Sequence, residues 1–214
     1  MGAVMNLSVD VISDVICPWC YIGKRRLEKA VAAHAGPVTV RWLPFQLNPQ
    51  MPKEGISRRE YRTKKFGSWE RSLQLDAQVA AAGEAEGIHF AFDRMERTPN
   101  TVDAHRLIWL ADEEGVQDAV VEALFLAYFT AGRDISNPHT LLDVVAEAGL
   151  DRGKADGVLT SGGGQEAIRE ADELARRVRV EGVPFFVING TVTLSGAQPS
   201  EAFLEGFKQV VGSM

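Results

Sequence analysis

The chain of 214 residues contains two cysteines, and they stand close together in the segment Cys17-Pro18-Trp19-Cys20. Two thiols at this spacing can close into a disulfide and reopen. Pro18 is favoured at the first position of a helix, where free backbone N–H groups stabilise an anion. Cys17 is therefore the candidate nucleophile, and Cys20, one turn further in, is the candidate resolving thiol. The pattern favours thiol–disulfide chemistry at the start of a helix.

Three other uses of the pair stay open at this point. A structural disulfide would close a very small loop, which stabilises a fold by only roughly 2 kcal/mol. A zinc site needs about four ligands, but the four histidines are scattered and there is no second CxxC, so we expect no metal. The two thiols could also be inert core residues.

The segments around the cysteines predict a β-α-β unit. Residues 7–12 are rich in β-branched side chains and indicate a buried strand, residues 18–35 are amphipathic, and residues 38–47 indicate a second strand. Two strands joined in this way are expected to be parallel, with a right-handed crossover. The polar face of the helix carries Lys24, Arg25 and Arg26, which add positive charge further along from the thiols.

Residues 49–164 show only helical periodicity, whereas strand character returns near the C-terminus. There, Asn189-Gly190 separates two short strand-like runs, which is a strong hairpin signal, and residues 199–211 indicate a final helix. We therefore predict an α/β domain formed by residues 1–48 and 165–214, interrupted by an all-helical domain of residues 49–164.

Composition narrows the choice of partner and compartment. The formal net charge of −6 leaves no basic excess for binding nucleic acid. No apolar run is long enough for a membrane span, and the first residues do not resemble a secretory signal, so we expect a cytoplasmic protein that does not bind membranes. Cytoplasmic thiols are kept reduced, which favours a catalytic or redox-sensing pair over a structural disulfide.

With the CxxC after the first strand and Val183-Pro184 opening the third, the element order resembles the thioredoxin fold, and the helical block resembles the insertion of DsbA-like proteins. More narrowly, segments over most of the chain resemble the FrnE family of DsbA-like oxidoreductases, which is related to the 2-hydroxychromene-2-carboxylate isomerases. These segments are Ser13-Asp14, Cys17–Gly23, Pro44–Pro49, Lys65–Gly67, Asn100–Arg106, Glu181–Phe186 and Ser195–Gln198.

The resemblance implies roles for residues of the redox site. Cys17 exchanges with a disulfide or a thiol, and Cys20 resolves the mixed disulfide. The bond before Pro184 is expected to be cis and to lie beside the cysteines, although only about 5–6 % of X–Pro bonds are cis. The backbone of Val183 would pair with a substrate strand. Trp19, between the cysteines, is expected to be exposed and to contact the partner.

Other residues are expected to support the site or to face the substrate. By resemblance, Asn100, His105 and Arg106 begin a helix that faces the substrate cleft; the alternative for His105 and Arg106 is an ordinary exposed helix start. Asp14 either tunes the cysteine pair or caps the turn before the helix. Pro18 supports the site by fixing the start of that helix.

We expect a DsbA-like thiol–disulfide oxidoreductase with no bound cofactor, for which glutathione is a candidate co-substrate. Its partner would be a protein or small molecule that contains a thiol or disulfide. One alternative is a glutathione-dependent isomerase or transferase of the 2-hydroxychromene-2-carboxylate isomerase or kappa-class type, although those relatives typically have serine in place of Cys17. Another is a non-enzymatic redox-sensing or chaperone module. The sequence does not give the oligomeric state.

A basic cluster stands out in this acidic chain. Its position in a helical segment is typical of a solvated helix face, and attraction of an anionic substrate such as glutathione is the second interpretation. The cluster consists of Arg58, Arg59, Arg62, Lys64, Lys65 and Arg71.

Overall fold

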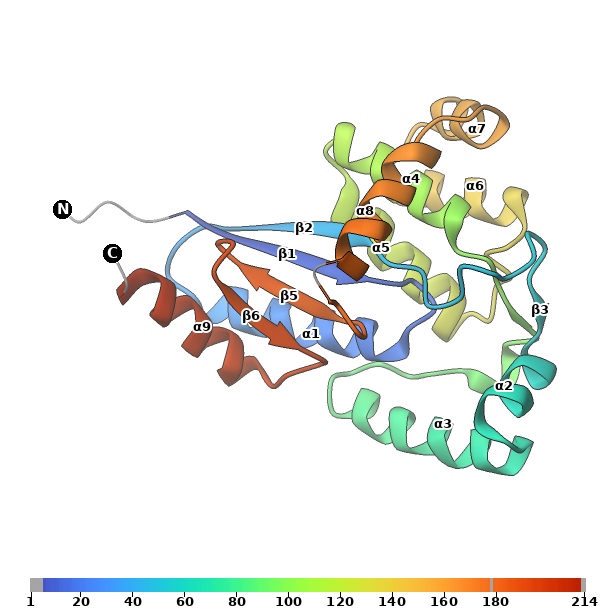
Figure 1. The fold of residues 1–214 in the computed structure, drawn as a ribbon, viewed down its shortest axis with the longest axis horizontal. Coiled ribbons are helices and arrows are strands. Elements are labelled where there is room, and N and C mark those ends of the chain that lie inside the picture. Colours follow the sequence, from blue (N-terminus) through green and yellow to red (C-terminus); the bar gives the residue numbers. More distant parts are fainter. Residues whose placement is uncertain (1–5, 178, 213–214) are drawn as a thin grey trace.

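The computed structural model describes residues 6–177 and 179–212, and it is built around a four-stranded sheet in the order β2-β1-β5-β6 (Figure 1). The strands are β1 (Leu7–Ser13), β2 (Val38–Pro44), β5 (Phe185–Ile188) and β6 (Val192–Ser195). β1 runs parallel to β2 and antiparallel to β5, which in turn pairs antiparallel with β6. The predicted β-α-β unit and C-terminal hairpin are therefore present.

Two helices pack against each other and cover one face of the sheet. They are α1 (Pro18–Ala33), which links β1 to β2, and α9 (Ser200–Gly212), which follows β6. Figure 1 shows both beneath the strands. α9 buries Phe203 and Phe207 in the core, and the Phe203 ring meets the edge of the Phe186 ring from β5. This packing fixes α1, and with it the cysteine pair, against the sheet.

The long segment between β2 and β5 is mainly helical, as expected. α5 and α4 pack on the edge strand β2, and α8 contacts both β2 and α4. The helices are α2 (Arg58–Phe66), α3 (Trp69–Glu84), α4 (Val102–Glu113), α5 (Gln117–Phe125), α6 (Pro138–Glu147), α7 (Arg152–Thr160) and α8 (Gln165–Arg177).

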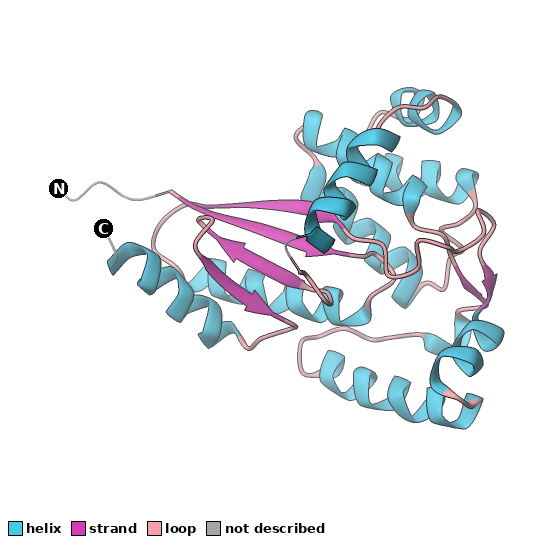
Figure 2. Cartoon of the chain, viewed as in Figure 1, coloured by secondary structure: helices cyan, strands magenta, loops and turns pink. Residues whose placement is uncertain are grey.

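The structure adds a short strand pair to a segment that was predicted to be all-helical. β3 (Ile56–Ser57) pairs antiparallel with β4 (Arg97–Thr98) and forms a separate two-stranded sheet, visible in magenta in Figure 2. Strands of two residues leave no alternating pattern to detect in the sequence. Its hydrogen bonds satisfy backbone groups of two loops that are far apart in the sequence but adjacent in the structure.

An ion-pair cluster joins α1 to the inserted helices. The buried Lys24 ammonium group lies 3.1 Å from Asp118 and 3.2 Å from Glu122 of the α5 helix, and it also pairs with Glu28. Arg25 pairs with Glu28 and Glu122. These cations are therefore neutralised locally and contribute little charge to the thiols at the start of α1.

Among the described residues, no helix combines the length and the apolar composition that crossing a membrane requires. β1 begins and α9 ends at one end of the molecule, whereas α2 and β3 lie at the opposite end (Figure 1).

Candidate functional site

Cys17 lies at the end of the turn that connects β1 to α1. It occupies the N-cap position of α1, and Pro18 is the first helical residue. The Cys17 thiol donates a hydrogen bond to the backbone carbonyl of Val183, 3.5 Å away. It is 5 % exposed and forms part of the wall of a pocket, whereas Cys20 is completely buried. Both cysteines are free thiols, and their side chains lie close together.

The loop before β5 lies against the cysteines. The Val183–Pro184 peptide bond is cis, and Pro184 is buried. Gly23 on α1 allows the close approach of this loop, because a Cβ atom there would come within 3.0 Å of both the Pro184 ring and the Phe186 ring. A larger residue at position 23 would therefore require the Pro184 and Phe186 rings, or α1 itself, to shift.

Asp14 is completely buried beneath the cysteines. Its backbone carbonyl accepts a hydrogen bond from the Cys17 N–H at 3.0 Å, and Oδ2 accepts one from the Leu47 N–H at 2.8 Å. The His105 Nε2 lies 3.5 Å from the Asp14 Oδ1, and it is a buried nitrogen for which the described residues provide no hydrogen bond. Asp14 thus orders the turn and also places a carboxylate within electrostatic range of Cys20.

The pKa of the Cys20 thiol is raised well above its ordinary value of 9.0. Burial is the main cause, and the neighbouring Cys17 raises it further, while a backbone hydrogen bond at Asp14 opposes the shift. Cys20 is therefore a neutral thiol at physiological pH, and it needs a proton acceptor before it can attack a disulfide.

This shift should make the stability of the reduced protein fall as the pH rises through the alkaline range, whereas the oxidised protein has no Cys20 thiol to ionise. Above about pH 9 the thiol ionises in the unfolded chain but stays protonated in the fold. The free energy of unfolding should then fall by up to about 1.4 kcal/mol per pH unit. Urea unfolding of both redox forms between pH 8 and pH 10.5 measures the difference. The matched control is reduced Cys20→Ala, and a curve parallel to that of the reduced wild type would contradict this prediction.

Two of the residues expected to face the substrate make hydrogen bonds within the protein. The Asn100 side chain accepts a hydrogen bond from the Val102 N–H and donates one to the Met51 carbonyl, so it caps the start of α4. Arg106 is 1 % exposed and donates to backbone carbonyls of the α7–α8 connection, among them Ser161 and Gly163, both at 2.7 Å. Its donors are thus used inside the protein, which corrects the expected substrate-facing placement.

His105 faces Asp14 rather than a substrate cleft. It comes from α4 of the inserted segment, which therefore contributes a side chain next to Asp14 and the cysteine pair. From the sequence, we expect His105 either to face the substrate cleft or to stand at an exposed helix start; in the structure it is buried beside Asp14.

A pocket of about 350 Å³ opens beside Cys17. Its walls come from the start of α1, from α2 and α3, and from the segment around Tyr128. Trp19 also forms part of the wall and is 41 % exposed, as the sequence predicted. None of Asn100, His105 and Arg106 is among the described residues that form this wall.

Half of the basic cluster lines this pocket. Arg58, Arg62 and Lys65 form part of the wall, whereas Arg59 and Arg71 are exposed and lie outside it. Sequence reasoning favoured a solvated face for the whole cluster. The spacing of four and then three residues, which places Arg58, Arg62 and Lys65 on one side of a helix, was the available signal that they act together.

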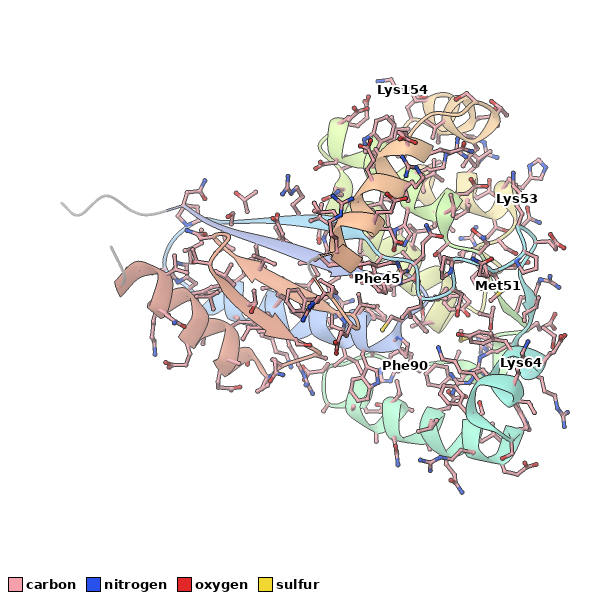
Figure 3. All side chains as sticks on the ribbon, viewed as in Figure 1. Phe45, Met51, Lys53, Lys64, Phe90 and Lys154 are labelled. Carbon is pink, nitrogen blue, oxygen red and sulfur yellow. The ribbon has the colours of Figure 1, made fainter. Side chains whose placement is uncertain are left out.

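Next to this pocket lies a more open hollow of about 650 Å³, which shares Leu47, Tyr61 and Lys65 with it. Its wall includes Met51, in the loop after β2, and Lys64, on α2; Figure 3 labels both at the end of the molecule where α2 lies. The described residues contain no group of three or more His, Cys, Asp or Glu side chains arranged to hold a metal ion.

A family model and a solved structure both relate this chain to DsbA-like proteins. The family model of the DSBA-like thioredoxin domain matches residues 8–208. A probable DsbA oxidoreductase from Streptomyces coelicolor is 32 % identical, with 97 % of this chain and 91 % of that chain covered and a TM-score of 0.90.

Two more distant structures share the fold. A 2-hydroxychromene-2-carboxylate isomerase is 19 % identical with a TM-score of 0.71, over 96 % of this chain and 95 % of that chain. The cytosolic disulfide reductase DsbM from Pseudomonas aeruginosa, in its structure with glutathione, is 21 % identical with a TM-score of 0.65, over 94 % and 99 %. From the family match and the similarity to the Streptomyces protein, this chain belongs to the family of DsbA-like thioredoxin domains.

Proposed function

We propose that the protein is a thiol–disulfide oxidoreductase that cycles Cys17 and Cys20 between dithiol and disulfide. The observation that carries the proposal is the position of Cys17. Its sulfur lies at the N-terminus of α1, borders a pocket, and has a second thiol one turn away. The segments quoted above support the narrower assignment to the FrnE group.

In the reducing direction, the Cys17 thiolate attacks one sulfur of a substrate disulfide, and the other sulfur leaves as a thiolate. Cys20 then loses its proton and attacks Cys17 in the mixed disulfide. The Cys17–Cys20 disulfide forms, the substrate leaves as a dithiol after protonation, and two electrons pass from enzyme to substrate. The oxidising direction is the reverse sequence of steps.

Resolution requires a buried base, because the pKa of Cys20 is raised. We assign this role to Asp14, whose carboxylate lies within electrostatic range of Cys20. His105 is a positioning residue in this scheme, since its Nε2 faces the Asp14 Oδ1 and is buried with it.

A protein substrate would pair with the backbone of Val183, next to Pro184, by adding an extended segment beside this loop. The exposed Trp19 would supply an apolar contact next to the reacting sulfur. Cytoplasmic function and the use of glutathione as co-substrate are part of the proposal and follow from the sequence expectations above.

The shared fold with a 2-hydroxychromene-2-carboxylate isomerase favours glutathione-dependent isomerisation as the second candidate function. In that case bound glutathione would do the chemistry, and Cys17→Ser would retain turnover. The presence of both thiols favours the dithiol reaction.

Trapping the intermediate tests the proposal. Reduced Cys20→Ser protein, mixed with a peptide disulfide, should accumulate a mixed disulfide at Cys17, because the resolving thiol is missing. Non-reducing mass spectrometry would detect the added peptide mass, whereas wild-type protein should release reduced peptide and gain an internal disulfide. If the wild type releases no reduced peptide and the variant forms no adduct, the proposal is wrong.

A further inference from the structure

The pocket beside Cys17 has a mainly apolar interior. Phe66 from α2, Val79 from α3, and Phe92 and Phe129 from neighbouring segments all contribute to its wall. Its volume of about 350 Å³ lies within the range of small-molecule sites. An apolar molecular body of modest size could therefore be held within reach of the Cys17 sulfur.

The wall of this pocket also carries an excess of positive charge. Arg58 and Arg62 share one carboxylate: the Arg58 Nη2 lies 2.7 Å from the Asp76 Oδ2, and the Arg62 Nη2 lies 2.6 Å from Oδ1. Arg58 and Asp76 are both buried. One of the two guanidinium charges therefore has no matching anion. Burial and the neighbouring Arg58 lower the pKa of Arg62, in keeping with this imbalance.

A third cation adds to the excess. The Lys65 ammonium group donates to the Tyr61 hydroxyl at 2.8 Å, and no carboxylate of the described residues pairs with it. No Asp or Glu is among the described residues that form the wall. The unmatched charge of the Arg58–Arg62 pair lies largely out of solvent, where it is costly, and a bound anion offsets that cost; the exposed Lys65 adds a further cation at the same wall.

We infer that this pocket binds a small thiol or disulfide substrate that has an apolar body and a carboxylate. The carboxylate lies at Arg62 and Lys65, and the sulfur lies at Cys17. This inference rests on the proposed function and names its substrate class. Glutathione fits the pocket less well, because its amide groups and ammonium group would lose hydration against the phenylalanine rings.

Dihydrolipoate is a suitable probe, because its neutral amide, dihydrolipoamide, differs only at the carboxylate. One thiolate of the probe attacks the Cys17 sulfur of oxidised enzyme, and Cys20 leaves as a thiolate and takes up a proton. The second thiolate of the probe then attacks the probe sulfur in the mixed disulfide and releases Cys17. The probe leaves as a cyclic disulfide, and the enzyme has gained two electrons.

The readout is the ratio of the rate constants for the two probes, measured by stopped-flow with oxidised enzyme. We expect roughly a tenfold preference of the wild type for dihydrolipoate, which is the size of one charge-assisted hydrogen bond. The preference should weaken as salt is added. Lys65→Gln and Arg62→Gln should each lower the ratio, by roughly threefold or more.

Arg71→Gln is the matched control. It removes the same charge from the same basic cluster, but outside the pocket, and should leave the ratio at the wild-type value. Lys65 is exposed, so Lys65→Gln is the decisive variant if Arg62→Gln fails to fold without its bond to Asp76.

The assay distinguishes a wrong substrate class from a wrong proposed function. If both probes are oxidised at equal rates and the ratio is the same in Lys65→Gln, the substrate class is wrong and the redox function stands. If wild-type protein oxidises neither probe faster than Cys17→Ser does, the proposed function itself is wrong.

Discussion

Replacing Cys17 with serine is expected to abolish thiol–disulfide exchange. The hydroxyl stays protonated at neutral pH and cannot form the mixed disulfide, so the rate of dithiol-peptide oxidation should fall by roughly a thousandfold or more. The assay follows fluorescence change of a peptide that carries two cysteines. Serine fits the position, and its hydroxyl can still donate to the Val183 carbonyl, so the fold should be retained.

The same variant separates the two candidate functions. If Cys17 is the nucleophile, addition of glutathione to the Cys17→Ser variant should not restore its enzymatic turnover. A glutathione-dependent rate close to that of the wild type would contradict the dithiol mechanism and support the isomerase candidate.

The second large effect is expected for Asp14→Asn. Without a carboxylate to take the proton of Cys20, resolution of the mixed disulfide should slow by roughly a hundredfold at pH 7. The rate should recover as the pH rises and hydroxide replaces the missing base. Rapid quenching with acid, followed by mass spectrometry, measures how long the mixed disulfide persists.

A stability measurement distinguishes this role from a purely structural one. Asparagine keeps an oxygen that accepts from the Leu47 N–H, and it removes the cost of a buried charge. The variant should therefore unfold at the same urea concentration as the wild type or at a higher one. Lower stability together with an unchanged resolution rate would show that Asp14 only orders the turn.

Local patterns in the sequence predicted most of the sheet and the start of the site. The β-branched run in β1 and the proline after Cys17 each determine structure through their own backbone preferences. Asn189 and Gly190 both have positive φ in the structure, as the Asn-Gly signal predicts, although Thr191 joins them in a three-residue loop between Ile188 and Val192.

Features that depend on packing between distant segments were not predictable in the same way. Arg106 looks like an ordinary charged residue of an amphipathic helix. It is buried because the α7–α8 connection passes over it and offers carbonyl groups to its guanidinium. Arg62 reaches the Cys17 pocket only because α2 and α3 dock beside the start of α1. The sequence pattern of a single helix or strand does not predict how that element packs against distant ones.

The hydrogen bond from Cys17 to the Val183 carbonyl has a consequence for turnover. The bond exists only while the sulfur carries its hydrogen. Once Cys17 enters a disulfide, the carbonyl loses this donor and can accept an N–H from an incoming chain instead. In the proposed cycle, affinity for an extended partner should therefore be higher in the disulfide form than in the form with a protonated Cys17 thiol. Protonation of Cys17 after a client is oxidised would then weaken binding of the product and favour its release.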